Sequence, residues 1–144
     1  MNSPPQIYCM VRKKWVDRTP EEEIRQHMVK YLNITRYIPL HLMVCEYPID
    51  YLKHRADLVI HDRKGKPLLL AEFKAPSVVI NHTVIAQIRR YNQQVQAPYL
   101  LISNGDTTLF WKYSQDKESY EPMRDIPPYE DLLKSIGHES AINT

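Results

Sequence analysis

The pattern of apolar and polar positions along the chain predicts two helices and a series of strands. Between residues 79 and 95, one set of residues recurs every three or four positions: Ile80, Val84, Ile88, Tyr91 and Val95. This spacing predicts an amphipathic helix. Short apolar runs predict strands at 41–47, 55–61, 68–74, 99–103 and 107–113.

An earlier helix is indicated by its start signal. Thr19 suits the N-cap position, Pro20 the first helical position and Glu22 the third, as in a capping box. The helical pattern continues to about Leu32, so we expect a helix from Pro20 to that residue.

A strand, a helix and a second strand follow one another between residues 68 and 103. Such a crossover places its two strands parallel in one sheet, and the flanking hairpins add antiparallel neighbours. The predicted fold class is therefore α/β, with a mixed central sheet of four to five strands flanked by helices. We expect one domain over residues 1–144, with a core at about 12–113 and a C-terminal extension at 114–144.

The composition is that of a folded domain without a membrane segment. Hydrophobic residues make up 43% of the 144 residues and charged residues 25%, which excludes a disordered or fibrous chain. No apolar run approaches the roughly 18 to 20 residues of a bilayer-spanning helix, and no signal peptide is recognisable, so we expect a cytoplasmic protein with no membrane partner. Cys9 and Cys45 lack the spacing of a zinc site, and the net charge of +2 does not by itself indicate a nucleic-acid partner.

The apolar strand that contains Phe73 ends in two charged residues. Side chains alternate along a strand, so Glu72 and Lys74 share one face and Phe73 takes the other. Charges at the end of a buried strand indicate a functional site. In the alternative interpretation Glu72 and Lys74 form an ordinary ion pair, and Asp57 pairs with Arg55 or caps a turn.

The register of the preceding hairpin brings a second carboxylate to this strand. A two-residue loop at Lys64-Gly65 places Asp57 directly opposite Glu72, whereas another loop length shifts the pairing by one residue. Opposed carboxylates repel each other unless a positive charge lies between them. A divalent cation supplies that charge, and carboxylate oxygens with the Phe73 carbonyl suit Mg²⁺, with Mn²⁺ as an alternative.

These residue types point to phosphodiester hydrolysis. A metal ion held by the two carboxylates polarises a phosphoryl oxygen and lowers the pKa of a bound water. Lys74 beside it would hold the attacking water and neutralise the charge that develops on the phosphate in the transition state.

Three motifs carry a family resemblance: Arg55-Ala56-Asp57, Ala71-Glu72-Phe73-Lys74-Ala75-Pro76 and Gln87-Ile88-Arg89-Arg90-Tyr91. Their order resembles the PD-(D/E)-x-K nuclease superfamily with its Q-x-x-x-Y element. More narrowly, residues 12–113 resemble the N-terminal nuclease domain of type I restriction enzyme R subunits, which implies a restriction-endonuclease-like fold. Ala56 stands where the first motif usually has proline. The chain also has no GxxxxGK[ST] loop, so we expect no ATP-driven translocation by this chain alone.

The resemblance implies a role for each matching residue. Asp57 and Glu72 would bind the metal ion, and Lys74 would be the catalytic lysine. Gln87 and Tyr91, four residues apart on one helix face, would support the active site. The alternative for this last pair is a core tyrosine beside a surface glutamine.

Further charged residues would surround the site. The resemblance implies an acidic residue from the first helix near the metal, at the position of Glu22, although the third residue of a capping box also bonds back to the cap. Phosphates that reach Lys74 require basic groups nearby, and the candidates are Arg89, Arg90, Arg25 and Lys14.

The leading hypothesis is a Mg²⁺-dependent deoxyribonuclease with DNA as its partner and weak sequence preference. A second hypothesis keeps the fold and drops the chemistry, leaving a non-catalytic DNA-binding or complex-assembly module. RNA and branched DNA are alternative substrates, because the same residues serve them all. A motor or specificity subunit is an expected kind of partner, and double-strand cleavage would favour a homodimer or two successive nicks.

Overall fold

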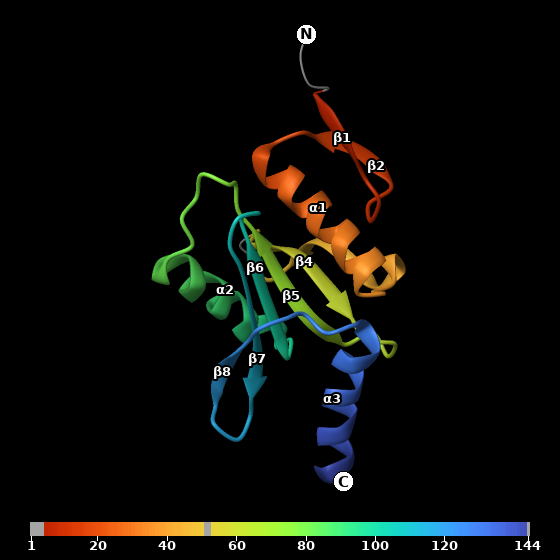
Figure 1. The fold of residues 1–144 in the computed structure, drawn as a ribbon, viewed down its shortest axis with the longest axis vertical. Helices are drawn as coiled ribbons and strands as arrows, with labels where there is room; N and C mark the ends of the chain where they lie inside the picture. The colour runs from red at the N-terminus through yellow and green to blue at the C-terminus, as the bar shows by residue number, and fades with distance from the viewer. Residues whose placement is uncertain (1–4, 51–52, 144) are drawn as a thin grey trace.

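The computed structural model describes residues 5–50 and 53–143, which form a six-stranded mixed sheet, a separate two-stranded sheet and three α-helices (Figure 1). The strands are β1 (Gln6–Cys9), β2 (Lys14–Asp17), β3 (Met43–Pro48), β4 (Arg55–His61), β5 (Pro67–Phe73), β6 (Tyr99–Ser103), β7 (Thr108–Ser114) and β8 (Ser119–Met123). The helices are α1 (Pro20–Thr35), α2 (His82–Val95) and α3 (Tyr129–Asn143), with a 3-10 turn at Leu40–Leu42. The predicted α/β class is confirmed.

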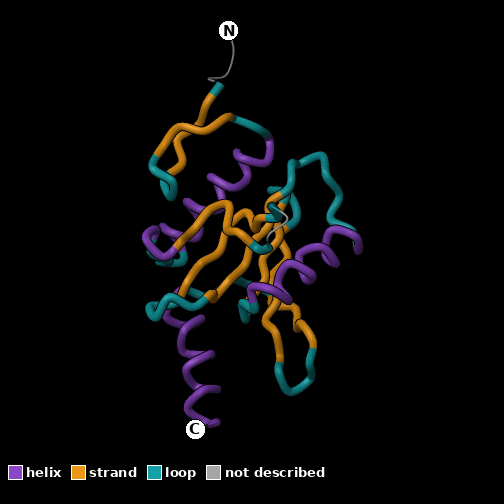
Figure 2. The backbone as a smooth tube through the Cα atoms, turned by 180° about the vertical axis from the view of Figure 1, so that it is seen from behind, coloured by secondary structure: helices purple, strands orange, loops and turns teal. Residues whose placement is uncertain are grey.

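The large sheet has the strand order β3-β4-β5-β6-β7-β8. β5 and β6 run parallel and are joined by α2, as the predicted crossover requires, whereas the other neighbours are antiparallel. α1 and α2 lie on opposite faces of this sheet, and the β1–β2 hairpin lies beside α1 (Figures 1 and 2).

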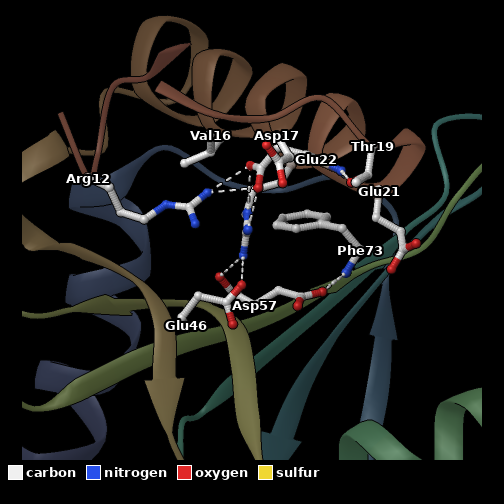
Figure 3. A pocket seen from close by; sticks show the side chains of 10 residues that line it. Arg12, Val16, Asp17, Thr19, Glu21, Glu22, Glu46, Asp57 and Phe73 are labelled. Carbon is white, nitrogen blue, oxygen red and sulfur yellow. Dashed lines mark hydrogen bonds and ion pairs between the residues drawn. The ribbon is translucent and has the colours of Figure 1, made fainter. Parts of the chain in front are cut away.

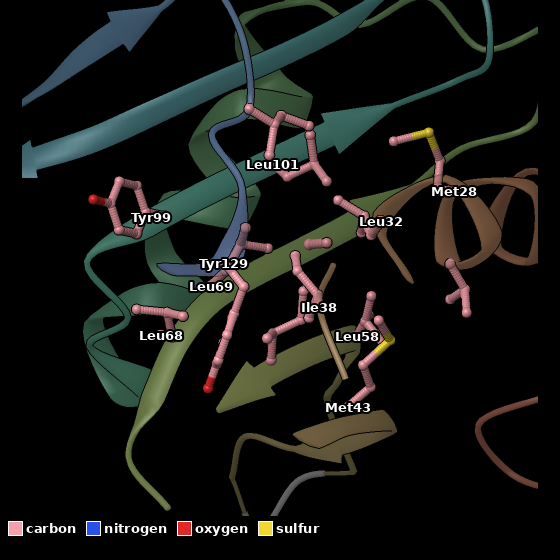
Figure 4. Packing of buried hydrophobic residues seen from close by; sticks show 14 of the residues in the cluster. Met28, Leu32, Ile38, Met43, Leu58, Leu68, Leu69, Tyr99, Leu101 and Tyr129 are labelled. Atoms are coloured by element: carbon pink, nitrogen blue, oxygen red, sulfur yellow. The ribbon is translucent and has the colours of Figure 1, made fainter. Parts of the chain in front are cut away.

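Each face of the large sheet is covered by its own core cluster. On one face, Met28 and Leu32 of α1 pack with Leu58 and Leu69 (Figure 4). On the other face, Ile88 of α2 packs with apolar side chains of β4, β5 and β6. Burial of each such aliphatic side chain contributes roughly 1.5–3 kcal/mol, so both helices are held firmly against the strands that carry the acidic residues.

The sheet has one strand more than the predicted maximum of five, because β8 pairs with β7. β8 has no regular alternation of apolar residues, and it includes Pro122 opposite Trp111. A proline is tolerated at the edge of a sheet, where one side of the strand needs no partner. The hydrophobic pattern that identifies buried strands is therefore missing from this one.

The segment after residue 113, for which the sequence predicts no element, also contributes to the core. Ile126 and two residues of α3, Tyr129 and Leu132, are buried in the cluster beneath α1 (Figure 4). The Tyr129 hydroxyl donates to the His61 carbonyl at 3.0 Å. These contacts attach the start of α3 to the end of β4.

The helix starts are set by side-chain caps. α1 begins at Pro20 as predicted, capped by the Thr19 side chain. α2 begins at His82 rather than near residue 79, because the Asn81 side chain accepts from the Val84 N–H at 3.1 Å. No helix within residues 5–50 and 53–143 is long and apolar enough to span a membrane.

The loop of the β4–β5 hairpin differs from the predicted two-residue turn. The Asp62 N–H donates to the Lys66 carbonyl at 2.8 Å, which leaves residues 63–65 between them. Gly65 adopts a φ of +84°, and the Asp62 carboxylate accepts from the Lys64 and Lys66 N–H groups. By itself this longer loop would shift the pairing of the two strands by one residue.

A β-bulge in β5 removes that shift, because Leu68 is skipped between the pairs Ile60–Leu69 and His61–Pro67. Beyond the bulge, Leu58 lies opposite Ala71, which is the register that a two-residue loop would have produced. One further step along the strands brings Asp57 to Glu72. The two carboxylate residues are thus neighbours as predicted, although the regular pairing ends at Leu58 and Ala71 and the predicted loop is wrong.

Asn92 attaches the end of α2 to the sheet. Its side chain is buried, donates to the Ala97 carbonyl (2.8 Å) and the Tyr120 hydroxyl (3.0 Å), and accepts from the Ala97 N–H (2.8 Å). An Asn92→Ala variant leaves both backbone groups of Ala97 without these partners, so we expect the free energy of unfolding to fall by about 2–4 kcal/mol. Urea unfolding checks this beside Gln93→Ala, an exposed position on the same helix; equal midpoints for the two variants would contradict it.

Candidate active site

Asp57 and Glu72 lie next to each other at one end of the β4–β5 hairpin. The Asp57 N–H donates to Glu72 Oε1 at 3.1 Å, and the Phe73 N–H donates to Asp57 Oδ2 at 2.7 Å. Each carboxylate therefore accepts a backbone hydrogen bond from the neighbouring strand. Glu72 is only 6% exposed and Asp57 is half-buried, so water shields their charges poorly.

Burial makes both carboxylates of this Asp57–Glu72 pair harder to ionise, and Asp57 adds to this effect at Glu72. Burial raises the pKa of Glu72, and the negative charge of Asp57 raises it further, to about 9. Burial also raises the pKa of Asp57, against the lowering effect of the hydrogen bond from Phe73. The pair thus holds a proton at neutral pH, and binding of a divalent cation would displace it.

Lys74 follows β5 directly. Its N–H donates to the Ser103 carbonyl of β6 at 3.0 Å, so the parallel strand fixes its backbone. Its side chain is half-buried, and its positive charge acts to lower the pKa of Glu72. The structure therefore brings this ammonium group together with the Asp57–Glu72 pair.

Gln87 and Tyr91 approach the same pair from α2. Gln87 Nε2 donates to Tyr91 Oη at 3.3 Å, and both side chains are half-buried. Burial raises the pKa of Tyr91, and the negative charges of Glu72 and Asp57 raise it further. This face of α2 therefore points toward the carboxylates, and Tyr91 is not an ordinary core aromatic.

Glu22 lies in a charged cluster formed by Arg12, Glu22, Arg25, Gln26 and Glu46, which we call the arginine cluster; Glu22 and Arg25 are buried in it, whereas Glu46 is exposed. Its carboxylate accepts from Arg12 (2.8 and 2.9 Å), Arg25 (2.6 and 3.0 Å) and Gln26 (2.8 Å). Burial alone would raise the pKa of Glu22, but these hydrogen bonds lower it to about 2. Glu22 neither bonds back to the helix cap nor presents a free carboxylate for a metal, because its oxygens are occupied by cationic and amide donors.

A cavity of about 320 Å³ is lined by Arg12, Glu22, Arg25 and Glu46 of the arginine cluster and by Asp57. Figure 3 shows Arg12 and Glu22 on one side of it, Glu46 and Asp57 on the other, and the Phe73 ring between. Its lining contains more carboxylates than guanidinium groups. The cavity is therefore suited to a cation and water rather than to an anion.

Three of the four predicted DNA-contacting residues are exposed. Lys14 lies on β2, and Arg89 and Arg90 lie on α2. The Arg89 guanidinium packs over the rings of Trp111 and Tyr120, at 5.6 and 5.1 Å from their centroids. The two rings would therefore hold the Arg89 guanidinium in place while it contacts a phosphate.

Arg25 is buried, although it was predicted to contact DNA at the surface. It is only 6% exposed, and it donates to Glu22, to Glu46 and to the Asp57 carbonyl. These donors are used within the protein, which corrects the prediction of a phosphate contact. Two of the three partners come from strands far along the chain, so the local sequence did not reveal this burial.

Arg12 and Glu46 are site residues to which the sequence analysis gave no role. Arg12 joins Glu22 from the β1–β2 hairpin, which no apolar alternation predicts. Glu46 has a φ of +56° and interrupts the pairing of β3 with β4. The run Cys45-Glu46-Tyr47 has the alternation of an ordinary strand, so it contains no signal of this interruption.

The donor atoms of the site are hard oxygens. Within residues 5–50 and 53–143, no group of three or more His, Cys, Asp or Glu side chains is arranged to hold a metal ion. Two carboxylates are present, and the Phe73 carbonyl predicted as a third ligand belongs to the same strand end. A mutually repelling carboxylate pair with backbone oxygen nearby fits Mg²⁺ or Mn²⁺ rather than a softer metal.

The sequence of this chain is similar to those of restriction enzymes. The family described as "Type I restriction enzyme R protein N terminus (HSDR_N)" matches residues 20–127. A similar solved structure is that of the type IIG restriction endonuclease BpuSI, with 23% sequence identity and a TM-score of 0.43 over 68% of this chain and 11% of that chain. No curated protein sequence matches the chain. The family match spans most of the 144 residues, and the chain therefore belongs to the family of type I restriction enzyme R protein N termini.

Proposed function

We propose that this protein is a Mg²⁺-dependent deoxyribonuclease of the PD-(D/E)XK type that hydrolyses phosphodiester bonds in DNA. The observation that carries the proposal is the buried Asp57–Glu72 pair, with Lys74 two residues farther along. A protein gains little from holding two repelling carboxylates together unless a cation binds them. Membership of a restriction enzyme family supports DNA as the substrate.

The metal ion would be held by the carboxylates of Asp57 and Glu72 and by the Phe73 carbonyl, with Mn²⁺ as an alternative to Mg²⁺. When bound, it would polarise a phosphoryl oxygen and make a bound water more acidic. Binding of the ion would release the proton that the raised pKa of Glu72 favours at neutral pH, and both carboxylates would then face the ion with their negative charges.

Lys74 would orient the attacking water and offset the negative charge that develops on the phosphate. The water gives up a proton to solvent as its oxygen forms a bond to phosphorus, one bridging P–O bond breaks, and the released oxygen takes up a proton from solvent. Tyr91 and Gln87 would fix the position of the reacting groups from α2, since their hydrogen bond holds the two side chains together. The closeness of Tyr91 to the carboxylates supports this role.

Lys14 on the β1–β2 hairpin and Arg89 and Arg90 on α2 would supply positive charge to the DNA backbone from opposite sides of the sheet, without reading bases. We therefore expect weak sequence preference. Selection of target sites would come from a partner, such as a motor or specificity subunit, and cleavage of both strands would come from a homodimer or from two nicks.

Cleavage of supercoiled plasmid by the purified protein in Mg²⁺ or Mn²⁺ tests the proposal. We expect relaxed or linear product from the parent and from Asp116→Ala, an exposed aspartate on the β7–β8 turn, and none above the metal-free background from Asp57→Ala. Calorimetric titration with Mn²⁺ adds a readout that needs no partner. A parent that neither binds Mn²⁺ nor cuts plasmid or single-stranded DNA would overturn the proposal and favour a non-catalytic DNA-binding or assembly module.

A further inference from the structure

The backbone N–H and carbonyl groups of Asp57 are held by side chains rather than by the sheet. The β3–β4 pairing skips this residue, and the β4–β5 pairing ends one residue before it. Its N–H donates to the Glu72 carboxylate, and its carbonyl accepts from Arg25 Nη1 at 3.1 Å. The usual strand-to-strand hydrogen bonds therefore do not determine where this peptide lies.

The strand also changes orientation at this point. Ala56 and Leu58 belong to different core clusters on opposite faces of the sheet, although residues two apart in a regular strand share a face. On the neighbouring strand, Glu46 has a left-handed φ of +56°. The backbone is therefore irregular both in β4 at Asp57 and in β3 at Glu46, so the position of Asp57 depends on other contacts.

Arg25 supplies such a contact from a fixed position. It donates to Glu22 through Nε (3.0 Å) and Nη2 (2.6 Å), and its Nη1 also donates to Glu46 (2.9 Å). Burial opposes its charge, but the hydrogen bonds and charge of Glu22 outweigh that effect, so the pKa of Arg25 is raised. Arg12 adds a second guanidinium to Glu22 from the β1–β2 hairpin.

We propose that Arg25 is a positioning residue of the metal site, which fixes the backbone of Asp57 and hence its carboxylate, with Glu22 as its charge partner and Arg12 as a second cation bound to Glu22. This inference rests on the proposed function. It assigns Glu22 to the support of Arg25 instead of to the metal. A Glu72 carboxylate that shares its charge with a cation attracts the Asp57 N–H less strongly, so the bond from Arg25 becomes the more important of the two.

The first test replaces Arg25 by lysine, which keeps the charge but loses the forked set of donors. Partners that orient metal ligands typically contribute 10–100-fold in metal affinity, so we expect the Kd for Mn²⁺ to rise by about that factor. The cleavage rate of the variant should recover most of its parental value at saturating Mn²⁺. Arg18→Lys is the matched control, because Arg18 pairs with Glu23 at the surface, and it should leave the Kd unchanged.

A second variant guards against loss of folding. In Arg25→Met/Glu22→Gln the buried charges are removed together, which a protein core tolerates better than one unpaired charge. We expect a cooperative unfolding transition and the same weakened Mn²⁺ binding as in Arg25→Met alone. If Glu22 were itself a metal ligand, adding Glu22→Gln would weaken binding further, and that outcome would overturn the assignment.

A readout without metal separates this inference from the proposed function. Amide hydrogen exchange at Asp57 and Phe73 should be about tenfold faster in Arg25→Lys than in the parent, with core amides such as that of Leu70 unchanged. Unchanged exchange at both sites, or an unchanged Kd for Mn²⁺, would overturn the positioning role. Absence of Mn²⁺ binding by the parent would instead overturn the proposed function, while the exchange rates would still report on Arg25.

Discussion

A Lys74→Met variant should cut plasmid DNA about 10²–10⁴-fold more slowly than the parent in saturating Mg²⁺. The loss arises because methionine has the length of the lysine stem but no charge to offer the attacking water or the phosphate. The backbone of residue 74 is fixed by the Ser103 carbonyl, so the site should keep its shape. Initial rates of plasmid relaxation, measured across Mg²⁺ concentrations, check this expectation.

Metal binding distinguishes a chemical role for Lys74 from a structural one. The ammonium group favours ionised Glu72 but also competes with a cation for it, so Lys74→Met should bind Mn²⁺ at least as tightly as the parent. Lys64→Met, on the exposed hairpin loop at the other end of β5, should behave as the parent in both assays. Loss of Mn²⁺ affinity in Lys74→Met, or an unchanged cleavage rate, would contradict the assigned role.

A Glu72→Gln variant should be more stable than the parent without metal, yet inactive. The folded-state pKa of Glu72 is about 9 and its ordinary value is 4.5, so the protonated form favours folding at low pH. That contribution is complete below about pH 4.5 and disappears as the pH rises through about 9. Glutamine stays neutral and can still accept from the Asp57 N–H, so we expect a Tm about 3–6 °C above that of the parent near pH 9.

Thermal unfolding from pH 4 to pH 9 in a chelator measures this effect. The two Tm values should converge near pH 4 and separate as the pH rises, whereas Glu118→Gln, on the exposed β7–β8 turn, should follow the parent throughout. Saturating Mn²⁺ should raise the Tm of the parent and leave that of Glu72→Gln unchanged. Parallel Tm profiles for the parent and Glu72→Gln would show that burial of this carboxyl has no energetic cost.

Local sequence patterns predicted the parts of the fold in which neighbours along the chain determine structure. β4 and β6 have the predicted bounds, and the capping residues place the start of α1 correctly. β8 and the β1–β2 hairpin were not predicted, because their residues lie at edges where half-exposed side chains lack a regular apolar period. Burial by distant segments, not local preference, determines those elements.

The same distinction applies to the candidate site. Asp57, Glu72 and Lys74 were identified because strand alternation and hairpin pairing are local rules, and these residues lie on one hairpin. The environment of Arg25 depends on Glu46 and on the Asp57 carbonyl, which come from β3 and β4. An arginine three residues after a glutamate on a helix has the pattern of a solvated surface pair, and only the packed structure shows that this pair is buried.

The bulge at Leu68 of β5 separates the tip of the β4–β5 hairpin from its active end. The third loop residue shifts the strand pairing by one residue, and the bulge shifts it back before Leu58. The pairs beyond the bulge are therefore those that a two-residue loop would give. A relative of this chain with one residue fewer at the tip would present the same two carboxylates if it kept the bulge, whereas a regular ladder would bring Asp57 opposite Ala71. The tip can thus accumulate insertions, deletions or an engineered tag during divergence or design, while the spacing of the acidic pair is inherited unchanged.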